Sequence, residues 1–444
     1  MKRAILAFTY TALKHAWSTR AILWLLVGVS IPALLLPLTL RADGTEHGAQ
    51  TMILTYTPVA IFAIVLTGTI WMAAFTFAAE RMQLQFAMLR TKPVQGASIW
   101  LGKWLAILAI TCTSLVWAML LCVLALIIRF DATTIVTAPT WTAFAPDETE
   151  IMEQARQQRE SMLQQPDAEH AHSLPSLQQL ANRIRQRQYR VLPGNQVSWQ
   201  IPIAPTSATQ PLWEIQYHWR LDPMRRAPVQ GDWMITVPTQ TEPLATHSVA
   251  GLIDGNHVIR LSDLDIPPSA PYVTLTFASA PENEPQIFFD NKNPVSLNRQ
   301  TGLLLGNLLR ATILLFALCA AAAALALTVS VFLSFPTTVF ATHGILLALV
   351  ITAIAGRDTP TIRDTHGHDH GSPDTWLVNA TESFLDMLYR ATRNLREALP
   401  FRELPENLQV TLHDHLPTLL ILLFGIPLLC ALLAHIKVMQ EEIP

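Results

Sequence analysis

The chain has 444 residues, of which 51% are hydrophobic and 14% are charged, and its formal net charge at pH 7 is −3. This balance argues against a nucleic-acid-binding protein, because such proteins carry a basic face. All the cysteines lie in apolar stretches, so no disulfide framework is available to the long polar insert in the middle of the chain. They are Cys112, Cys122, Cys319 and Cys430.

Residues 1–20 predict an amphipathic helix that lies in the membrane interface. Basic side chains alternate there with large apolar ones, and no uninterrupted apolar run follows the first residues, so the segment is not a cleavable signal. The basic residues would face the lipid headgroups, and the first apolar stretch begins just after them. They include Lys2, Arg3, Lys14 and Arg20.

Six apolar stretches are each near the roughly 20 residues that a helix needs to cross a hydrocarbon layer about 30 Å thick. They cover residues 22–40, 53–78, 104–128, 311–334, 338–355 and 417–436. Pro336 separates the fourth from the fifth, because proline breaks a helix. We therefore expect an α-helical polytopic membrane protein with six transmembrane helices. Three lie within 21–128, two within 301–355 and one within 417–444.

The distribution of Lys and Arg near the ends of these stretches sets the expected orientation. Basic residues cluster before the first span and in the loop 79–103, whereas Arg41 stands alone between the first two spans. Both termini are therefore expected in the cytoplasm, and the segments 129–300 and 356–416 outside it. The second of these segments carries six arginines against the rule. Its length of about 60 residues is the length at which the rule stops applying.

The insert between the third and fourth spans predicts an extracytoplasmic α+β domain. Residues 129–195 form a polar helical segment that Pro166 and Pro175 interrupt. Residues 196–300 alternate with period two between turn signals, which is typical of an antiparallel β-sandwich, and we expect 196–293 to fold alone. The tryptophans of these strands either pack in the core or form a ligand-stacking platform. They are Trp199, Trp213, Trp219 and Trp233.

The loop 79–103 between the second and third spans carries the clearest motif. A Glu-Arg pair, a leucine-rich turn, a Pro-Val break and a Leu-Gly-Lys follow one another in it. The residues are Glu80, Arg81, Leu89, Arg90, Pro93, Val94, Leu101, Gly102 and Lys103. This order resembles the coupling-helix loop of ATP-binding-cassette (ABC) type-2 export permeases. The resemblance extends to the architecture and covers roughly residues 1–128 and 303–444, whereas the smallest members of that family lack the large insert.

The resemblance implies the permease subunit of an ATP-driven exporter in the bacterial inner (cytoplasmic) membrane. A separate ABC ATPase would dock on the loop, and the permease would work as a homodimer or paired with a second permease. The residues implied in coupling are Glu80, Arg81, Leu89, Arg90, Pro93, Gly102 and Lys103. A second interpretation is that the loop is only a positively charged anchor on the cytoplasmic side.

ATP hydrolysis is expected in the partner subunit and not in this chain. A phosphate-binding loop requires Ser or Thr after its Gly-Lys, whereas Trp104 follows Gly102 and Lys103 here. The chain is therefore expected to be no enzyme and to bind no cofactor itself. Arg310 and His343 lie near span ends, and the spans hold almost no charge, which argues against an ion-coupled transporter.

A histidine tract in the loop 356–416 has two interpretations. Alternating imidazoles beside a carboxylate could ligate Zn²⁺, Cu²⁺ or Ni²⁺ through His366, His368 and His370. The same tract could equally be part of a solvated polar loop. Residues 376–396 predict an external amphipathic helix. The alternative to a permease is a membrane-anchored binding or scaffold protein whose external domain recognises a partner.

Overall fold

The computed structural model describes residues 2–41, 46–82, 96–163, 175–203, 212–221, 227–238, 240, 242–252, 255–261, 264–267, 270–290, 294–355, 399–401 and 403–440. Their contacts divide the chain into two compact units. The β unit comprises the described residues of Trp141–Thr301. The helical unit comprises those of Met1–Thr140 and of the chain from Gly302 onward.

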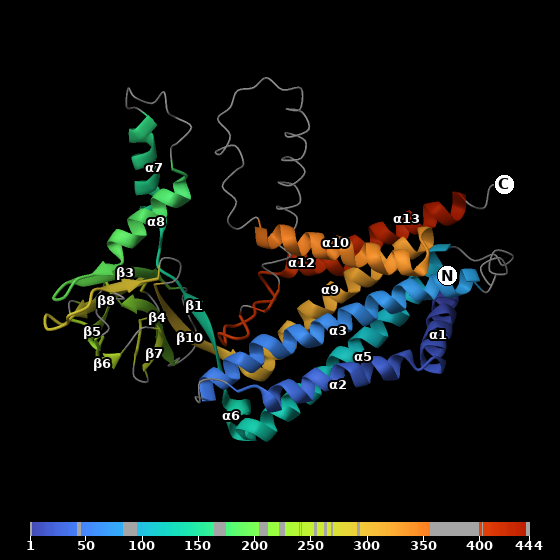
Figure 1. Ribbon diagram of the computed structural model, residues 1–444, viewed down its shortest axis with the longest axis horizontal. Helices are drawn as coiled ribbons and strands as arrows, with labels where there is room; N and C mark the ends of the chain where they lie inside the picture. The colour runs from blue at the N-terminus through green and yellow to red at the C-terminus, as the bar shows by residue number, and fades with distance from the viewer. Residues whose placement is uncertain are drawn as a thin grey trace. The chain divides into compact units, whose positions relative to one another are not determined.

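The helical unit has a helix at each predicted apolar stretch (Figure 1). Three of these helices begin seven or eight residues before the predicted stretch. Each stretch becomes a helix because an apolar run without strong breakers can satisfy all its backbone hydrogen bonds internally. The helices are α1 Lys2–Ser18, α2 Ala21–Thr39, α3 Glu46–Met82, α5 Gly96–Phe130, α6 Ala132–Thr137, α9 Leu304–Phe332, α10 Phe335–Ala355, α12 Leu416–Leu420, the π-helical turn η3 Ile421–Gly425 and α13 Ile426–Gln440.

Five stretches in the described part of the chain are long and apolar enough to cross a membrane. They are Ala21–Thr39, Gly48–Phe77, Gly96–Phe130, Leu304–Phe332 and Leu416–Ile436. The helical membrane class is thereby confirmed by length and composition. The predicted span 338–355 coincides with α10. Within α10, the apolar helical stretch Phe335–Leu349 is shorter than the five membrane-length stretches. The count of six spans therefore stays a prediction.

Helix α9 is the centre of the helical unit. Two thirds of its apolar window, 67%, is buried, against at most 39% for the other four membrane-length helices. A run of alanines at residues 320–324 lets neighbouring backbones approach closely, as small residues do in membrane bundles. Helices α3, α5, α10 and α13 all pack on α9. A displacement of α9 would therefore also displace the helices that pack on it.

The β unit contains two antiparallel sheets, as the alternating pattern predicted (Figure 1). One has the order β1-β10-β4-β9-β2 with β7 also paired to β4, and the other has the order β3-β8-β5-β6. The strands are β1 Pro139–Phe144, β2 Arg190–Val191, β3 Gln196–Pro202, β4 Trp213–Leu221, β5 Val229–Thr236, β6 Ala245–Leu252, β7 Gly255–Leu261, β8 Tyr272–Ser279, β9 Ile287–Phe289 and β10 Val295–Leu303.

The strand tryptophans form the core between these sheets and are not a ligand platform. Trp199, Trp219 and Trp233 are at most 3% exposed, and Trp213 is 2% exposed. The rings of Trp199 on β3 and Phe289 on β9 lie 4.8 Å apart, edge to face, so the two sheets meet through them. Burial of each such ring contributes roughly 1.5–3 kcal/mol. The core interpretation of these residues is thus confirmed.

The two helices of the insert belong to the same core as the strands. α7 Thr149–Leu163 contributes Ile151 and Ala155, and α8 Leu177–Gln188 contributes Leu180 and Ala181, to the buried cluster that both sheets share. The pattern change near residue 195 therefore marks a change of secondary structure within one packing unit. Whether 196–293 folds without these helices stays a prediction.

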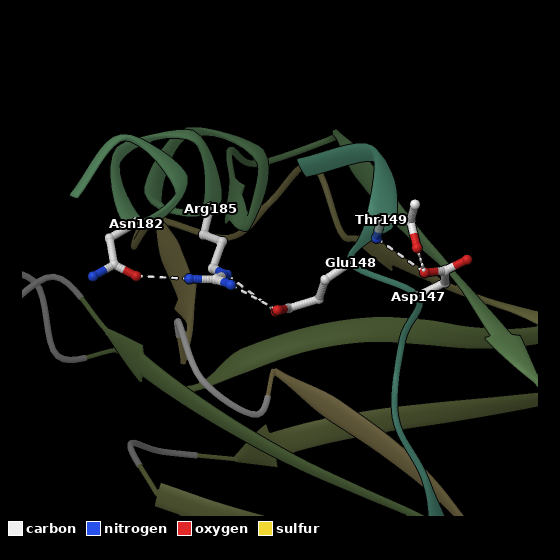
Figure 2. A network of polar contacts seen from close by, with 5 residues as sticks. All are labelled: Asp147, Glu148, Thr149, Asn182 and Arg185. Carbon is white, nitrogen blue, oxygen red and sulfur yellow. Dashed lines mark hydrogen bonds and ion pairs between the residues drawn. The ribbon is translucent and has the colours of Figure 1, made fainter. Parts of the chain in front are cut away.

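A partly buried ion pair holds α8 to the start of α7 (Figure 2). Arg185 donates from Nε and Nη2 to the two carboxylate oxygens of Glu148 at 3.0 and 2.6 Å, and from Nη1 to Asn182 at 2.7 Å. The neighbouring Asp147 accepts bonds from the hydroxyl and the backbone N–H of Thr149, which hold the pKa of that carboxyl below its usual value. These contacts fix the start of α7.

Candidate functional site

The predicted coupling loop leads into the first turns of α5, where four residues contact three other helices. We call Trp100, Gly102, Lys103 and Trp104 the α5 junction. Three of them are at most 9% exposed, and Gly102 is buried as well. The junction lies within the helical unit, and its Gly102 and Lys103 belong both to the predicted loop 79–103 and to α5, which begins at Gly96.

Gly102 lets α1 cross α5 at close range. A Cβ atom at this position would lie 2.7 Å from Phe8 Cβ and 2.8 Å from the Ile5 carbonyl oxygen, so only glycine fits without a shift. The Thr9 hydroxyl donates to the Gly102 carbonyl at 3.0 Å. Arg20, with a φ of 58°, then turns the chain between α1 and α2 (Figure 1). Helix α1 is thereby held at the beginning of α5.

Lys103 connects α5 to the end of α3. Its side chain is only 2% exposed, and its ammonium nitrogen lies 3.7 Å from the centre of the Phe77 ring. A buried ammonium is costly unless its charge is compensated, and the negative face of an aromatic ring attracts it. Because α3 ends at Met82, this contact holds the helix on the other side of the predicted coupling loop.

Two tryptophans connect α5 to α9. Their rings stack at 5.9 Å with an interplanar angle of 20°, as their spacing of four residues on one helix allows. Trp100 Nε1 donates to the Thr328 hydroxyl at 3.2 Å, and Trp104 Nε1 donates to the Ala320 carbonyl at 3.1 Å. Thr328 also lies 3.3 Å from the Cys430 carbonyl of α13. The junction therefore reaches α13 through α9.

The predicted site residues fall into two groups. Gly102 and Lys103 lie together in the α5 junction. Glu80 and Arg81 lie in the last turn of α3, although their side chains are outside the described residues. Leu89, Arg90 and Pro93 are outside the described residues, as are the tract His366, His368 and His370 and the predicted helix 376–396. The described residues contain no cluster of metal-ligating side chains.

The partners of the junction were not foreseen from the sequence. Phe8, Thr9, Phe77 and Thr328 come from three helices, and each resembles an ordinary apolar or hydroxyl residue of a membrane helix. A weak signal existed in the Trp-x-x-x-Trp spacing and in a lysine inside an otherwise apolar helix start. Comparisons of the chain with family models, with curated proteins and with solved structures find no match. Its function must therefore be inferred from its own residues and contacts.

Proposed function

We propose that the chain is the permease subunit of an ATP-driven exporter, and that a separate cytoplasmic ATPase acts on the loop 79–103. The α5 junction is the observation that supports this proposal most strongly. Its four residues tie α5, which contains the last residues of the predicted loop, to α1, to α3 and to α9 at once. A loop that served only as a charged anchor would not require such a junction.

The junction suggests how the ATPase would move the spans. Nucleotide binding closes an ATPase, and a docked loop would be displaced with it. The loop joins the end of α3 to the start of α5, and the contact between Phe77 and Lys103 keeps these two ends together. Close-packed elements transmit displacements because they deform little. The motion would therefore pass to α9 and α13 as a shift of whole helices.

The remaining features fit this architecture. Helix α1 buries none of its residues, and Leu6, Tyr10 and Trp17 are each more than 60% exposed, as expected of a helix whose apolar face meets lipid in the interface. We propose six spans with both termini in the cytoplasm, and a dimer of permeases with two ATPases. The β unit would then lie outside the cytoplasm.

Co-purification tests the docking of the ATPase. The tagged chain is isolated from its native membranes in mild detergent, and subunits with a phosphate-binding loop are quantified by mass spectrometry. We expect an ATPase with the wild type, and its loss in Leu89→Asp and Arg90→Glu, whereas Arg156→Glu on the exposed surface of α7 retains it. Equal ATPase in all variants would refute docking on this loop. An external partner without any ATPase would favour the anchored scaffold protein.

A further inference from the structure

A half-open cavity lies inside the helical unit, away from the α5 junction. Its volume is about 40 Å³, and three helices and one later segment line it. α3 contributes Pro58 and Ile61, and Leu404 comes from the segment before the last span. The other lining residues are Leu115, Met119 and Cys122 of α5 and Leu308, Ala311, Thr312 and Leu315 of α9.

The chemistry of this lining selects an apolar occupant. Its only oxygen-bearing side chain is that of Thr312, whose hydroxyl already donates to the Leu308 carbonyl at 2.7 Å. The cavity exceeds the roughly 10–15 Å³ that one water requires, but a water needs two or more polar partners and apolar cavities stay dry. The helices that line the cavity include stretches of membrane length, and the apolar groups that surround such helices in a bilayer are the alkyl chains of lipids.

Residues 403–410, which we call the strap, contribute Leu404 to the lining of the cavity. Asn307 of α9 is fully buried and makes two hydrogen bonds to the strap. Its Nδ2 donates to the Leu408 carbonyl, and its Oδ1 accepts from the Val410 N–H, each at 2.7 Å. Leu404, which is 1% exposed, is thereby held against the cavity. Just before the strap, the rings of Phe401 and Phe62 lie 5.6 Å apart.

We propose that this cavity binds the end of one acyl chain of a membrane phospholipid and that the strap, held by Asn307, retains it. The volume suits a terminal part of a chain, which enters through the open side while the rest of the lipid stays in the bilayer. A void left empty would forfeit the dispersion contacts of its walls. This site is independent of the docking of an ATPase on the loop 79–103.

Photolabelling of the full chain in lipid nanodiscs tests the proposal. The probe is a phosphatidylcholine with a diazirine near the end of one acyl chain, and adducts are located by mass spectrometry. We expect adducts to concentrate on residues 115–122 and 308–315. Ala311→Phe, which fills the cavity, should lower their yield about tenfold. The matched control is Leu309→Phe, on the same helix but 52% exposed, which should leave the yield unchanged.

Two further variants protect the test against misfolding of Ala311→Phe. Met119→Ala enlarges the cavity and should raise the adduct yield there, and Asn307→Ala frees the strap and should speed exchange of the bound probe for unlabelled lipid. Adducts spread evenly over the exposed faces of α2 and α13, without an excess at the cavity, would overturn the proposal. An unchanged yield in folded Met119→Ala would overturn it as well.

Discussion

The ammonium nitrogen of Lys103 on α5 lies 3.7 Å from the centre of the Phe77 ring on α3. These helices flank the loop to which we assign the docking of an ATPase. Gly102, the residue before Lys103, is in contact with α1 on another side. Neighbouring positions of α5 thus contact both α1 and α3, so a displacement of the loop would reach both helices through the α5 junction.

Replacement of Lys103 by methionine should uncouple the ATPase without releasing it. Methionine retains much of the side-chain length but loses the cation–π attraction, which contributes about 2 kcal/mol when desolvated. We expect normal ATPase association and a fall in ATP turnover of about tenfold. Lys14→Met, at an exposed position on α1, is the control and should keep wild-type turnover. Wild-type turnover in Lys103→Met would show that this contact plays no part in coupling.

Gly102→Ala should destabilise the helical unit although alanine favours helices. The new methyl group would meet Phe8 Cβ and the Ile5 carbonyl at less than 3 Å, and such overpacking costs about 1–3 kcal/mol. Gly344→Ala on α10 is the control, because nothing lies within 4 Å of the added atom. Thermal unfolding of the purified variants, followed by size-exclusion chromatography, should show a lower midpoint for Gly102→Ala alone. Equal midpoints would mean that α1 does not pack on α5 as described.

A fragment of residues 139–303 should fold alone and should be much more stable than 196–293, the fragment that the sequence pattern alone predicts to fold. The shorter fragment lacks β1, β2, β10 and both helices, and therefore loses the buried Ala155, Leu180, Val295 and Leu297. Loss of buried apolar contacts of this kind costs several kcal/mol in total. Circular dichroism of the two fragments, followed during thermal unfolding, compares their secondary structure and their unfolding midpoints. Equal cooperative transitions would show that the helices are accessory to the sheets.

Arg185→Met should lower the free energy of unfolding of fragment 139–303 by roughly 1–3 kcal/mol. The arginine is 7% exposed and donates twice to Glu148, so its loss leaves that carboxylate without its main partner. Arg187→Met, at an exposed position on the same helix, should change little and serves as the control. Denaturant titration gives both values. Equal effects of the two substitutions would indicate that the ion pair adds no stability.

The β unit should lose stability at alkaline pH. Burial raises the pKa of Tyr217 from 10.0 to about 12, and burial, followed by the charge of Glu148, raises that of Tyr189 to about 12 as well. The unfolded chain releases these protons first, so their contribution is complete below pH 10 and is lost as pH rises toward 12. Tyr217→Phe should weaken this pH dependence. Titration of tyrosine absorbance at an ordinary pKa in the folded fragment would contradict it.

The sequence predicted the elements that carry a strong period and missed those that tertiary contacts impose. Apolar runs located the membrane helices, although α3, α5 and α9 begin seven or eight residues before the predicted stretches, and alternation located β4 and β8. Strand β10 was missed because its second half, Asn298 to Thr301, is polar throughout, and it is ordered by pairing with β4. The edge strand β6 was missed because most of its side chains are small or polar and exposed, so they do not alternate between apolar and polar.

The candidate site was predictable only in part, for a similar reason. A local motif marked Gly102 and Lys103, but their partners on α1 and α3 are distant in the chain, and no local pattern pairs them. Asn307 was not singled out from the sequence, because a single asparagine at the start of an apolar helix carries no local signal. Its partner, the Leu408 carbonyl, lies 101 residues later in the chain, so no local sequence pattern could predict this contact.

ATP hydrolysis by the complex purified on the tagged chain tests the central claim most directly. The account predicts that the wild type brings down a phosphate-binding subunit and hydrolyses ATP, and that Leu89→Asp, inserted normally in the membrane, retains neither property. A chain that is isolated intact from its native membranes without any nucleotide-binding subunit, or a Leu89→Asp variant with full hydrolysis, would contradict the assignment as a permease driven through the loop 79–103.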